Sequence, residues 1–233
     1  HYDPENYLIV MEDLGASSDF MWMYEKDKNL SEEELNILVC FLAALHKGRF
    51  TNREIERFPD NLKLRELNHQ HIFVLPFDPD NGFPLDELQN GLKELAAPYT
   101  QHKALKNKLK ELGDKYLSEG RQLIHGDFYP GSWVRTHDGL KVIDPEFGFM
   151  GFPEFELGIL AAHLWMAGRP LDQAVASIRK TYPAGIDWDE VLKYAAAEAM
   201  RRIIGIAQLP LDMDLDEKKS ILAKASTILL HEN

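Results

Sequence analysis

The segment His125–Ser132 reads HGDFYPGS, and the segment Val142–Phe147 that follows it reads VIDPEF. Each places an acidic residue after a short apolar run, on a turn that contains glycine or proline. Short strands that end in carboxylates can hold two or three oxygens within reach of one hard cation. Asp127 can also accept a proton from an attacking hydroxyl. The alternative is that the acids only shape the two turns.

Short strands are predicted on both sides of these turns. Gln122–Ile124 has the character of a strand, and residues 133–135 and 140–143 form a predicted hairpin whose connection contains an Asp-Gly pair. The pattern then becomes helical, over residues 155–168, 171–181, 187–208 and 215–231. The sequence therefore predicts an α+β fold that is mainly α-helical, with a small β-hairpin at the two acidic loops.

The beginning of the chain carries two local signals. The apolar run Tyr7–Met11 predicts a short buried strand. Ser31 and Glu34 have the spacing of a capping box, and leucines at helical spacing follow them as far as Gly48.

The middle of the chain is less regular. Residues 49–84 contain four prolines and are predicted to lack regular structure. Residues 85–120 are predicted to be mostly helical, with an interruption near Pro98.

Composition excludes several classes of function. The 233 residues contain 26 lysines and arginines against 38 acidic residues, which gives a net charge of −12. So acidic a chain is unsuited to nonspecific binding of nucleic acid or of a membrane surface. The apolar stretch Leu157–Gly168 is too short to span a bilayer. A single cysteine, Cys40, rules out an internal disulfide and favours a cytoplasmic location.

Taken together, the motifs resemble those of the aminoglycoside phosphotransferase and choline kinase superfamily, which has a protein-kinase-like fold. That family has His-Gly-Asp, four residues, a metal-binding residue, and a later strand-borne Asp. Here the order is His125–Asp127, four residues, Ser132, and then Asp144. Leu8–Leu14 resembles the family's hinge strand beside adenine, and Leu42–His46 resembles the helix before its variable insert.

Three features are similar to the methylthioribose kinase branch of that superfamily. Ser132 stands where most members have Asn, and the second acidic motif reads Asp-Pro-Glu over residues 144–146. The stretch Ala199–Gly205 contains paired arginines, Arg201 and Arg202, like the pair near the substrate in that branch.

The resemblance implies an organisation for the chain. Residues 16–233 would form the C-terminal lobe of a kinase-like phosphotransferase, and residues 1–15 the hinge strand and linker. No Gly-rich phosphate loop is present in the sequence. We therefore expect an N-terminal lobe of the same polypeptide to be missing, and the fragment alone to be inactive.

The resemblance also implies roles for individual residues. Asp127 would be the base, and His125 would belong to the catalytic group by bracing the loop through hydrogen bonds. Mg²⁺ would be held by Asp144, Glu146 and Ser132, and the nucleotide, ATP or GTP, by Met11, Glu12 and Asp13. Arg201 and Arg202 would bind the small hydroxylated substrate, unless they form an ordinary ion pair with Glu198.

The expected activity is transfer of the γ-phosphate to a hydroxyl of a small metabolite. Methylthioribose, an aminoglycoside, choline and an aminated sugar all fit this chemistry. Two other classes remain open: a noncatalytic kinase-like binding module, and a metal-dependent phosphohydrolase that uses the same carboxylates on water.

Overall fold

The computed structural model describes residues 2–3 and 5–231. It is rich in helix and contains three small antiparallel sheets, which confirms the predicted α+β class. The helices are α1 (Glu32–His46), α2 (Asn52–Arg57), α3 (Leu62–His69), α4 (Leu85–Leu88), α5 (Leu92–Thr100), α6 (Lys103–Leu117), α7 (Pro153–Met166), α8 (Leu171–Thr181), α9 (Trp188–Ile204) and α10 (Leu215–Leu230).

The strands are short and pair only with antiparallel neighbours. They are β1 (Tyr2–Asp3), β2 (Leu8–Ile9), β3 (Ser18–Asp19), β4 (Gln122–Ile124), β5 (Trp133–Thr136), β6 (Gly139–Val142) and β7 (Phe149–Gly151). The predicted hairpin is present as β5 and β6, with Thr136 opposite Gly139, and β3 adds a third strand on the other side of β5. β4 pairs with β7, so the strand before the first acidic motif lies beside the strand after the second.

The helix predicted after Ser31 is confirmed as α1. The Ser31 side chain accepts a hydrogen bond from the backbone N–H of Glu34, and the Glu34 carboxylate accepts one from the Ser31 N–H. These reciprocal bonds satisfy amide groups that have no partner inside the helix. Leu38 and Leu42 of α1 are fully buried.

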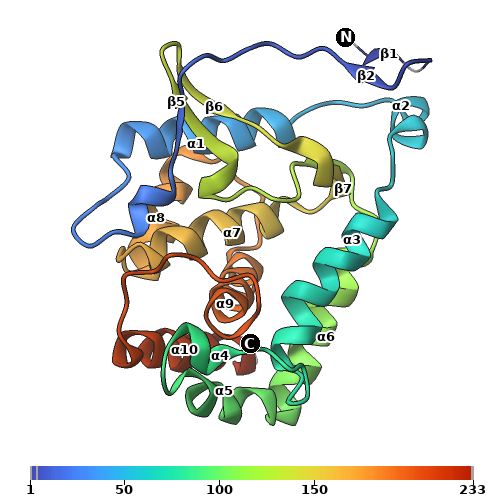
Figure 1. Cartoon of the computed structure of the whole chain (residues 1–233). Helices are drawn as coiled ribbons and strands as arrows, with labels where there is room; N and C mark the ends of the chain where they lie inside the picture. The colour runs from blue at the N-terminus through green and yellow to red at the C-terminus, as the bar shows by residue number, and fades with distance from the viewer. Residues whose placement is uncertain (1, 4, 232–233) are drawn as a thin grey trace.

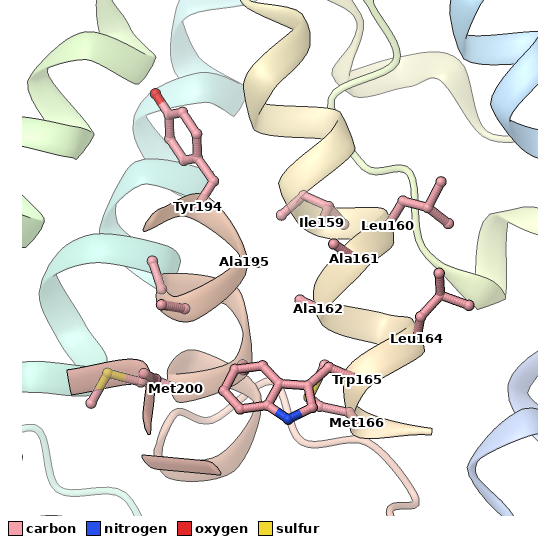
Figure 2. Packing of buried hydrophobic residues seen from close by; sticks show 14 of the residues in the cluster. Ile159, Leu160, Ala161, Ala162, Leu164, Trp165, Met166, Tyr194, Ala195 and Met200 are labelled. Carbon is pink, nitrogen blue, oxygen red and sulfur yellow. The ribbon is translucent and has the colours of Figure 1, made fainter. Parts of the chain in front are cut away.

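The core is built around α7 and α9, which lie side by side (Figure 2). Small side chains, including Ala161, Ala162 and Ala195, lie where the two helices face each other. At Gly158 of α7 an added Cβ would lie 2.5 Å from the Cβ of Tyr194. Because these backbones approach so closely, we expect larger residues there to force the helices apart.

One prediction about the middle of the chain is wrong. Residues 49–84 contain α2, α3 and a helical continuation, a π-helical turn at Gln70–Val74 and a 3₁₀ turn at Leu75–Phe77. The prolines lie between or at the ends of these helices, where a missing N–H costs little. Residues 85–120 are mostly helical, as predicted, and the interruption expected near Pro98 falls at Gln101 and His102, while Pro98 itself lies inside α5.

The prediction of a buried strand at Tyr7–Met11 is also wrong. Only Leu8 and Ile9 are in a strand, β2, which pairs with β1, and both side chains are exposed. Figure 1 shows this segment running outside the helical body before the chain enters β3. Within the described residues, no helix combines the length and the apolar character that a membrane span requires.

Candidate active site

β4 leads directly into the catalytic loop, defined here as His125–Ser132. Gly126 has a φ of +85°, in the left-handed region that glycine enters without strain. A Cβ at this position would lie 2.2 Å from the carbonyl oxygen of Phe147. The acidic turn, defined here as Asp144–Phe147, therefore lies against the catalytic loop, and only glycine permits that approach.

Hydrogen bonds connect the two loops. The Nε2 atom of His125 donates to the carbonyl oxygen of Ile143 at 2.8 Å, and its Nδ1 atom accepts a long bond from the Asp127 N–H at 3.4 Å. The Ile143 N–H donates to the carbonyl oxygen of Ser132 at 2.9 Å. His125 is buried and both of its ring nitrogens are occupied, so the geometry favours bracing over proton transfer.

A buried glutamate supports the catalytic loop from behind. Glu156, in the first turns of α7, accepts a hydrogen bond from the Gly126 N–H at 2.8 Å. Its other oxygen lies 2.8 Å from Nε2 of His46 at the end of α1, and Nδ1 of that histidine lies 2.8 Å from the Tyr182 hydroxyl. The sequence analysis did not identify Glu156. The available signal was a charged residue inside a strongly apolar helical run.

Ser132 makes a contact within the catalytic loop that the sequence did not predict. Its side chain is buried, and its hydroxyl donates to the backbone carbonyl of Asp127 at 2.9 Å. The Ser132 hydroxyl therefore fixes the backbone of Asp127, the candidate base. A role for Ser132 in metal binding stays a prediction.

Asp127 lies in an electrostatic field of mixed sign. Burial raises the pKa of its carboxyl, and the guanidinium groups of Arg201 and Arg202 oppose that rise. A buried carboxylate that holds its proton more readily is a better base toward a hydroxyl group. Both its position in the catalytic loop and the arginines of the last turn of α9 therefore affect the pKa of the Asp127 carboxyl.

The paired arginines form an ion pair with Glu198, which was the alternative to a role in substrate binding. The Nε atoms of Arg201 and Arg202 both donate to its carboxylate, the second at 2.8 Å. The guanidinium of Arg202 also lies over the ring of Tyr129 in the catalytic loop, 5.0 Å from the centroid. The ion pair does not remove the arginines from the site, because both still act on Asp127. Their contact with a substrate stays a prediction.

The acidic turn presents its carboxylates to solvent. Asp144 has a φ of +61°, in the left-handed region that Asp and Asn tolerate better than most residues, and its side chain is exposed. Glu146 is also exposed. Asn61, which precedes α3, donates from its side-chain amide to the carbonyl oxygens of Glu146 and Gly148. The sequence analysis missed this contact because it treated the segment around Asn61 as irregular.

The donors of the acidic turn fit a magnesium ion that arrives with a nucleotide. In the described residues no group of three or more His, Cys, Asp or Glu side chains forms a ready-made metal site. Mg²⁺ usually keeps several waters and takes one or two carboxylates together with substrate phosphates. Two exposed carboxylates separated by one residue, Asp144 and Glu146, meet that requirement.

The predicted nucleotide contacts Met11, Glu12 and Asp13 lie on the exposed N-terminal segment, outside any strand. No contact in the structure joins them to the catalytic loop among the hydrogen bonds and ion pairs of the described residues. Their role in nucleotide binding stays a prediction.

Comparison with known proteins shows the family to which the chain belongs. Residues 5–194 match the model of the phosphotransferase enzyme family. The chain is 23% identical over 262 residues to a methylthioribose kinase of Bacillus mycoides (strain KBAB4), covering 98% of this chain and 62% of that protein. It is 26% identical over 249 residues to a methylthioribose kinase of Bacillus cereus (strain AH187), covering 92% of this chain and 57% of that protein.

Two solved structures are also similar in outline. A spectinomycin phosphotransferase with ADP and spectinomycin has a TM-score of 0.48 at 14% identity, covering 91% of this chain and 68% of that chain. A choline kinase from Streptococcus pneumoniae has a TM-score of 0.45 at 15% identity, covering 94% and 68%. Both scores are below 0.5.

The match over residues 5–194 identifies the chain as a member of the phosphotransferase enzyme family. Within that family the chain is similar to methylthioribose kinases, and it spans about 62% or less of the length of those cited above. The family resemblance inferred from the motifs is confirmed.

Proposed function

We propose that the full-length protein transfers the γ-phosphate of ATP or GTP to a hydroxyl group of a small metabolite. The observation that carries the proposal is the arrangement around Asp127. A partly buried carboxylate lies on a loop fixed by His125, Ser132 and Glu156, beside two exposed carboxylates and two arginines. A module that only binds a ligand does not need a base held this way.

In this mechanism Asp127 orients the acceptor hydroxyl and takes its proton. The hydroxyl oxygen forms a new bond to the γ-phosphorus, and the bond from that phosphorus to the bridging oxygen of the nucleotide breaks. Arg201 and Arg202 supply positive charge beside the reacting group, and the two terminal nitrogens of the planar Arg201 guanidinium can hold two oxygens. His125 and Ser132 keep the base in place.

Mg²⁺ would be held by Asp144 and Glu146, and would neutralise charge on the nucleotide phosphates. Ser132 is the weakest member of the proposed metal set, because its hydroxyl already donates to the Asp127 carbonyl. The Asp-Pro-Glu turn keeps both carboxylates in solvent, where a nucleotide that carries its metal can reach them.

We assign the exposed segment at the start of the chain to the nucleotide side of the site. Residues 1–15 would act as hinge and linker, with Met11, Glu12 and Asp13 near the nucleotide base, and residues 16–233 would form the C-terminal lobe. The exposed apolar side chains of Leu8 and Ile9 support a segment that another surface covers in the working enzyme.

Methylthioribose is the first acceptor to test, because the curated relatives cited above carry that name. The experiment measures nucleoside diphosphate release by the full-length protein with Mg-ATP or Mg-GTP, against methylthioribose, choline, an aminoglycoside and an aminated sugar. Release that depends on one acceptor supports the proposal. Release of inorganic phosphate without any acceptor would favour the phosphohydrolase, and no release with any pair would contradict both.

A further inference from the structure

A fully buried carboxylate lies behind the paired arginines. Glu198 occupies the last turns of α9, three and four residues before Arg201 and Arg202, so one face of the helix carries all three. Its two oxygens receive the Nε–H groups of the two arginines. Burial opposes ionisation of Glu198, but the two guanidinium groups hold its pKa well below the usual range. Glu198 therefore carries its negative charge inside the protein.

A second layer holds Glu198 from the opposite side. Nε2 of His163, on α7, lies 3.2 Å from the Glu198 carboxylate in a buried polar contact that lacks the angle of a hydrogen bond, and the Tyr24 hydroxyl lies 2.5 Å from Nδ1 of the same ring. Since a carboxylate only accepts, the consistent arrangement has the proton on Nε2 and the tyrosine donating to Nδ1. Burial lowers the pKa of His163 to about 4, so the ring is neutral. Three elements of the fold thus converge on one carboxylate.

The hydrogen bonds to Glu198 use only the Nε atoms of the two arginines and leave their terminal nitrogens for other partners. One terminal nitrogen of Arg202 donates to the carbonyl oxygen of Ala207 at 3.3 Å. The terminal nitrogens of Arg201 make no hydrogen bond to any protein atom in the described residues. Arg201 therefore has its fork of donors available for oxygens of a substrate.

The charges explain why a buried glutamate is needed here. Two adjacent guanidinium groups repel each other, and burial intensifies the repulsion. After Glu198, the next carboxylate that attracts both of them is Asp127. Without Glu198 the arginines would turn toward Asp127, pair with it, and make it a poorer base.

We propose that Glu198 is a positioning residue of the phosphotransferase: it holds both arginines by their Nε atoms, directs the free end of Arg201 to the transferring phosphate, and keeps both from neutralising Asp127. The proposal rests on the function proposed above. It assigns Glu198 no contact with substrate or metal.

The test compares Glu198→Gln with Glu190→Gln in the full-length protein. Glu190 is a matched control, because it is a largely buried glutamate of the same helix, paired with Lys115 and remote in sequence from the arginines. We expect Glu198→Gln to lower kcat/KM for the acceptor by about tenfold or more. The KM for Mg-nucleotide should change by less than about threefold, and Glu190→Gln should keep normal kinetics while losing stability.

Glu198→Asp keeps the charge and should recover part of the loss. If Glu198→Gln does not fold, Tyr24→Phe is the second variant, because it removes only the hydroxyl that contacts His163. It should raise the KM for the acceptor without lowering the affinity for nucleotide. Normal kinetics in folded Glu198→Gln, or in Tyr24→Phe if the first does not fold, would overturn the proposal. So would a loss of activity equal to that of Glu190→Gln at the same folded fraction.

A readout that needs no turnover separates this proposal from the proposed function. Amide and guanidinium nitrogen NMR of the full-length protein should show slowly exchanging Nε–H signals from Arg201 and Arg202, assigned with the Arg201→Lys and Arg202→Lys variants. Both signals should exchange faster in Glu198→Gln and stay unchanged in Glu190→Gln. If these signals are protected in the wild type but the wild type transfers no phosphate, Glu198 still positions the arginines and the proposed phosphotransferase function is refuted. If the signals are unprotected in the wild type, the role of Glu198 is refuted.

Discussion

The catalytic loop and the acidic turn touch each other, yet they are built in opposite ways. In the catalytic loop His125 and Ser132 are 4% and 1% exposed, and each donates a side-chain hydrogen bond to the backbone. In the acidic turn Asp144 and Glu146 are exposed, and the turn is held by bonds to its main chain. A base must keep one orientation in a site with little water. Ligands for an incoming metal must stay reachable.

The largest effect is expected at the buried side of this comparison. Asp127→Asn in the full-length protein should lower turnover by about 10²–10⁴-fold, because a positioned general base contributes that much. Nucleotide affinity should change by no more than a few-fold, since the role proposed for Asp127 is toward the acceptor hydroxyl and not toward the phosphates. Steady-state kinetics and calorimetric titration with Mg-nucleotide measure the two quantities.

The same variant should not lose stability. The folded-state pKa of Asp127 is raised, so the ionised group opposes folding once the pH exceeds the unfolded value, and the neutral amide removes that cost. The Tm of Asp127→Asn at pH 7 should equal or exceed that of the wild type. A variant with substantial activity would refute the assignment of the base.

At the exposed side, Asp144→Asn should weaken binding of Mg-nucleotide by about tenfold or more, because a neutral amide replaces an anionic ligand of a hard cation. Asn is the matched replacement, since it tolerates the left-handed backbone at this position, which Ala does not. Its Tm should stay near that of the wild type. Glu146→Gln should weaken binding less. Unchanged titrations for both variants would place the metal elsewhere.

Ser132→Ala distinguishes two roles for this residue: bracing of the catalytic loop and binding of the metal. If the hydroxyl braces Asp127, its loss should cost about 1 kcal/mol of stability and lower kcat, with the dependence of rate on Mg²⁺ concentration unchanged. If Ser132 is a metal ligand, the Mg²⁺ concentration for half-maximal rate should rise instead. Titrating Mg²⁺ at saturating nucleotide for Ser132→Ala separates these outcomes.

One further effect is on stability alone, with none expected on turnover, and concerns His163, which lies behind Tyr129 of the catalytic loop, with ring centroids 6.0 Å apart. Its pKa is lowered to about 4, so below pH 6.5 the unfolded chain binds a proton that the folded chain does not. Stability should therefore fall as the pH drops from 6.5 toward 4, by on the order of 3 kcal/mol from this group. Denaturant titrations across that range should show a shallower slope in His163→Gln.

His137 provides the control for that slope, because its side chain is 92% exposed. His137→Gln should keep the pH dependence of the wild type. If His163→Gln and the wild type lose stability in parallel, the neutral buried ring is not the source of the slope.

The parts of the fold that depend on local signals could be predicted from the sequence. The capping box at Ser31 and Glu34, the Asp-Gly hairpin and the periodic helices after Pro153 all form as expected, because each is decided by neighbours within a few residues. The prolines led to a wrong prediction for residues 49–84, which contain helices. A proline ends a helix only where it removes a needed N–H or causes a clash, and that depends on its position in the helix.

The candidate site residues could be proposed from their motifs, but the distant residues that hold those motifs in place could not. His125, Asp127 and Asp144 were identified because their motifs are contiguous. Glu156 and Asn61 were not, since each reaches the site from a distant part of the chain through a backbone contact. Burial was equally inaccessible: the apolar run at Tyr7–Met11 has the composition of a core strand and lies exposed.

The most direct test of the central claim follows the γ-phosphate itself. The full-length wild type and Asp127→Asn are incubated with Mg²⁺, γ-labelled nucleotide and methylthioribose or the best acceptor of the panel, and the label is located by ³¹P NMR or chromatography. The account predicts label on the acceptor with the wild type, at a rate reduced by about 10²-fold or more in Asp127→Asn. Equal rates for the two proteins, or label found only as free phosphate, would contradict it.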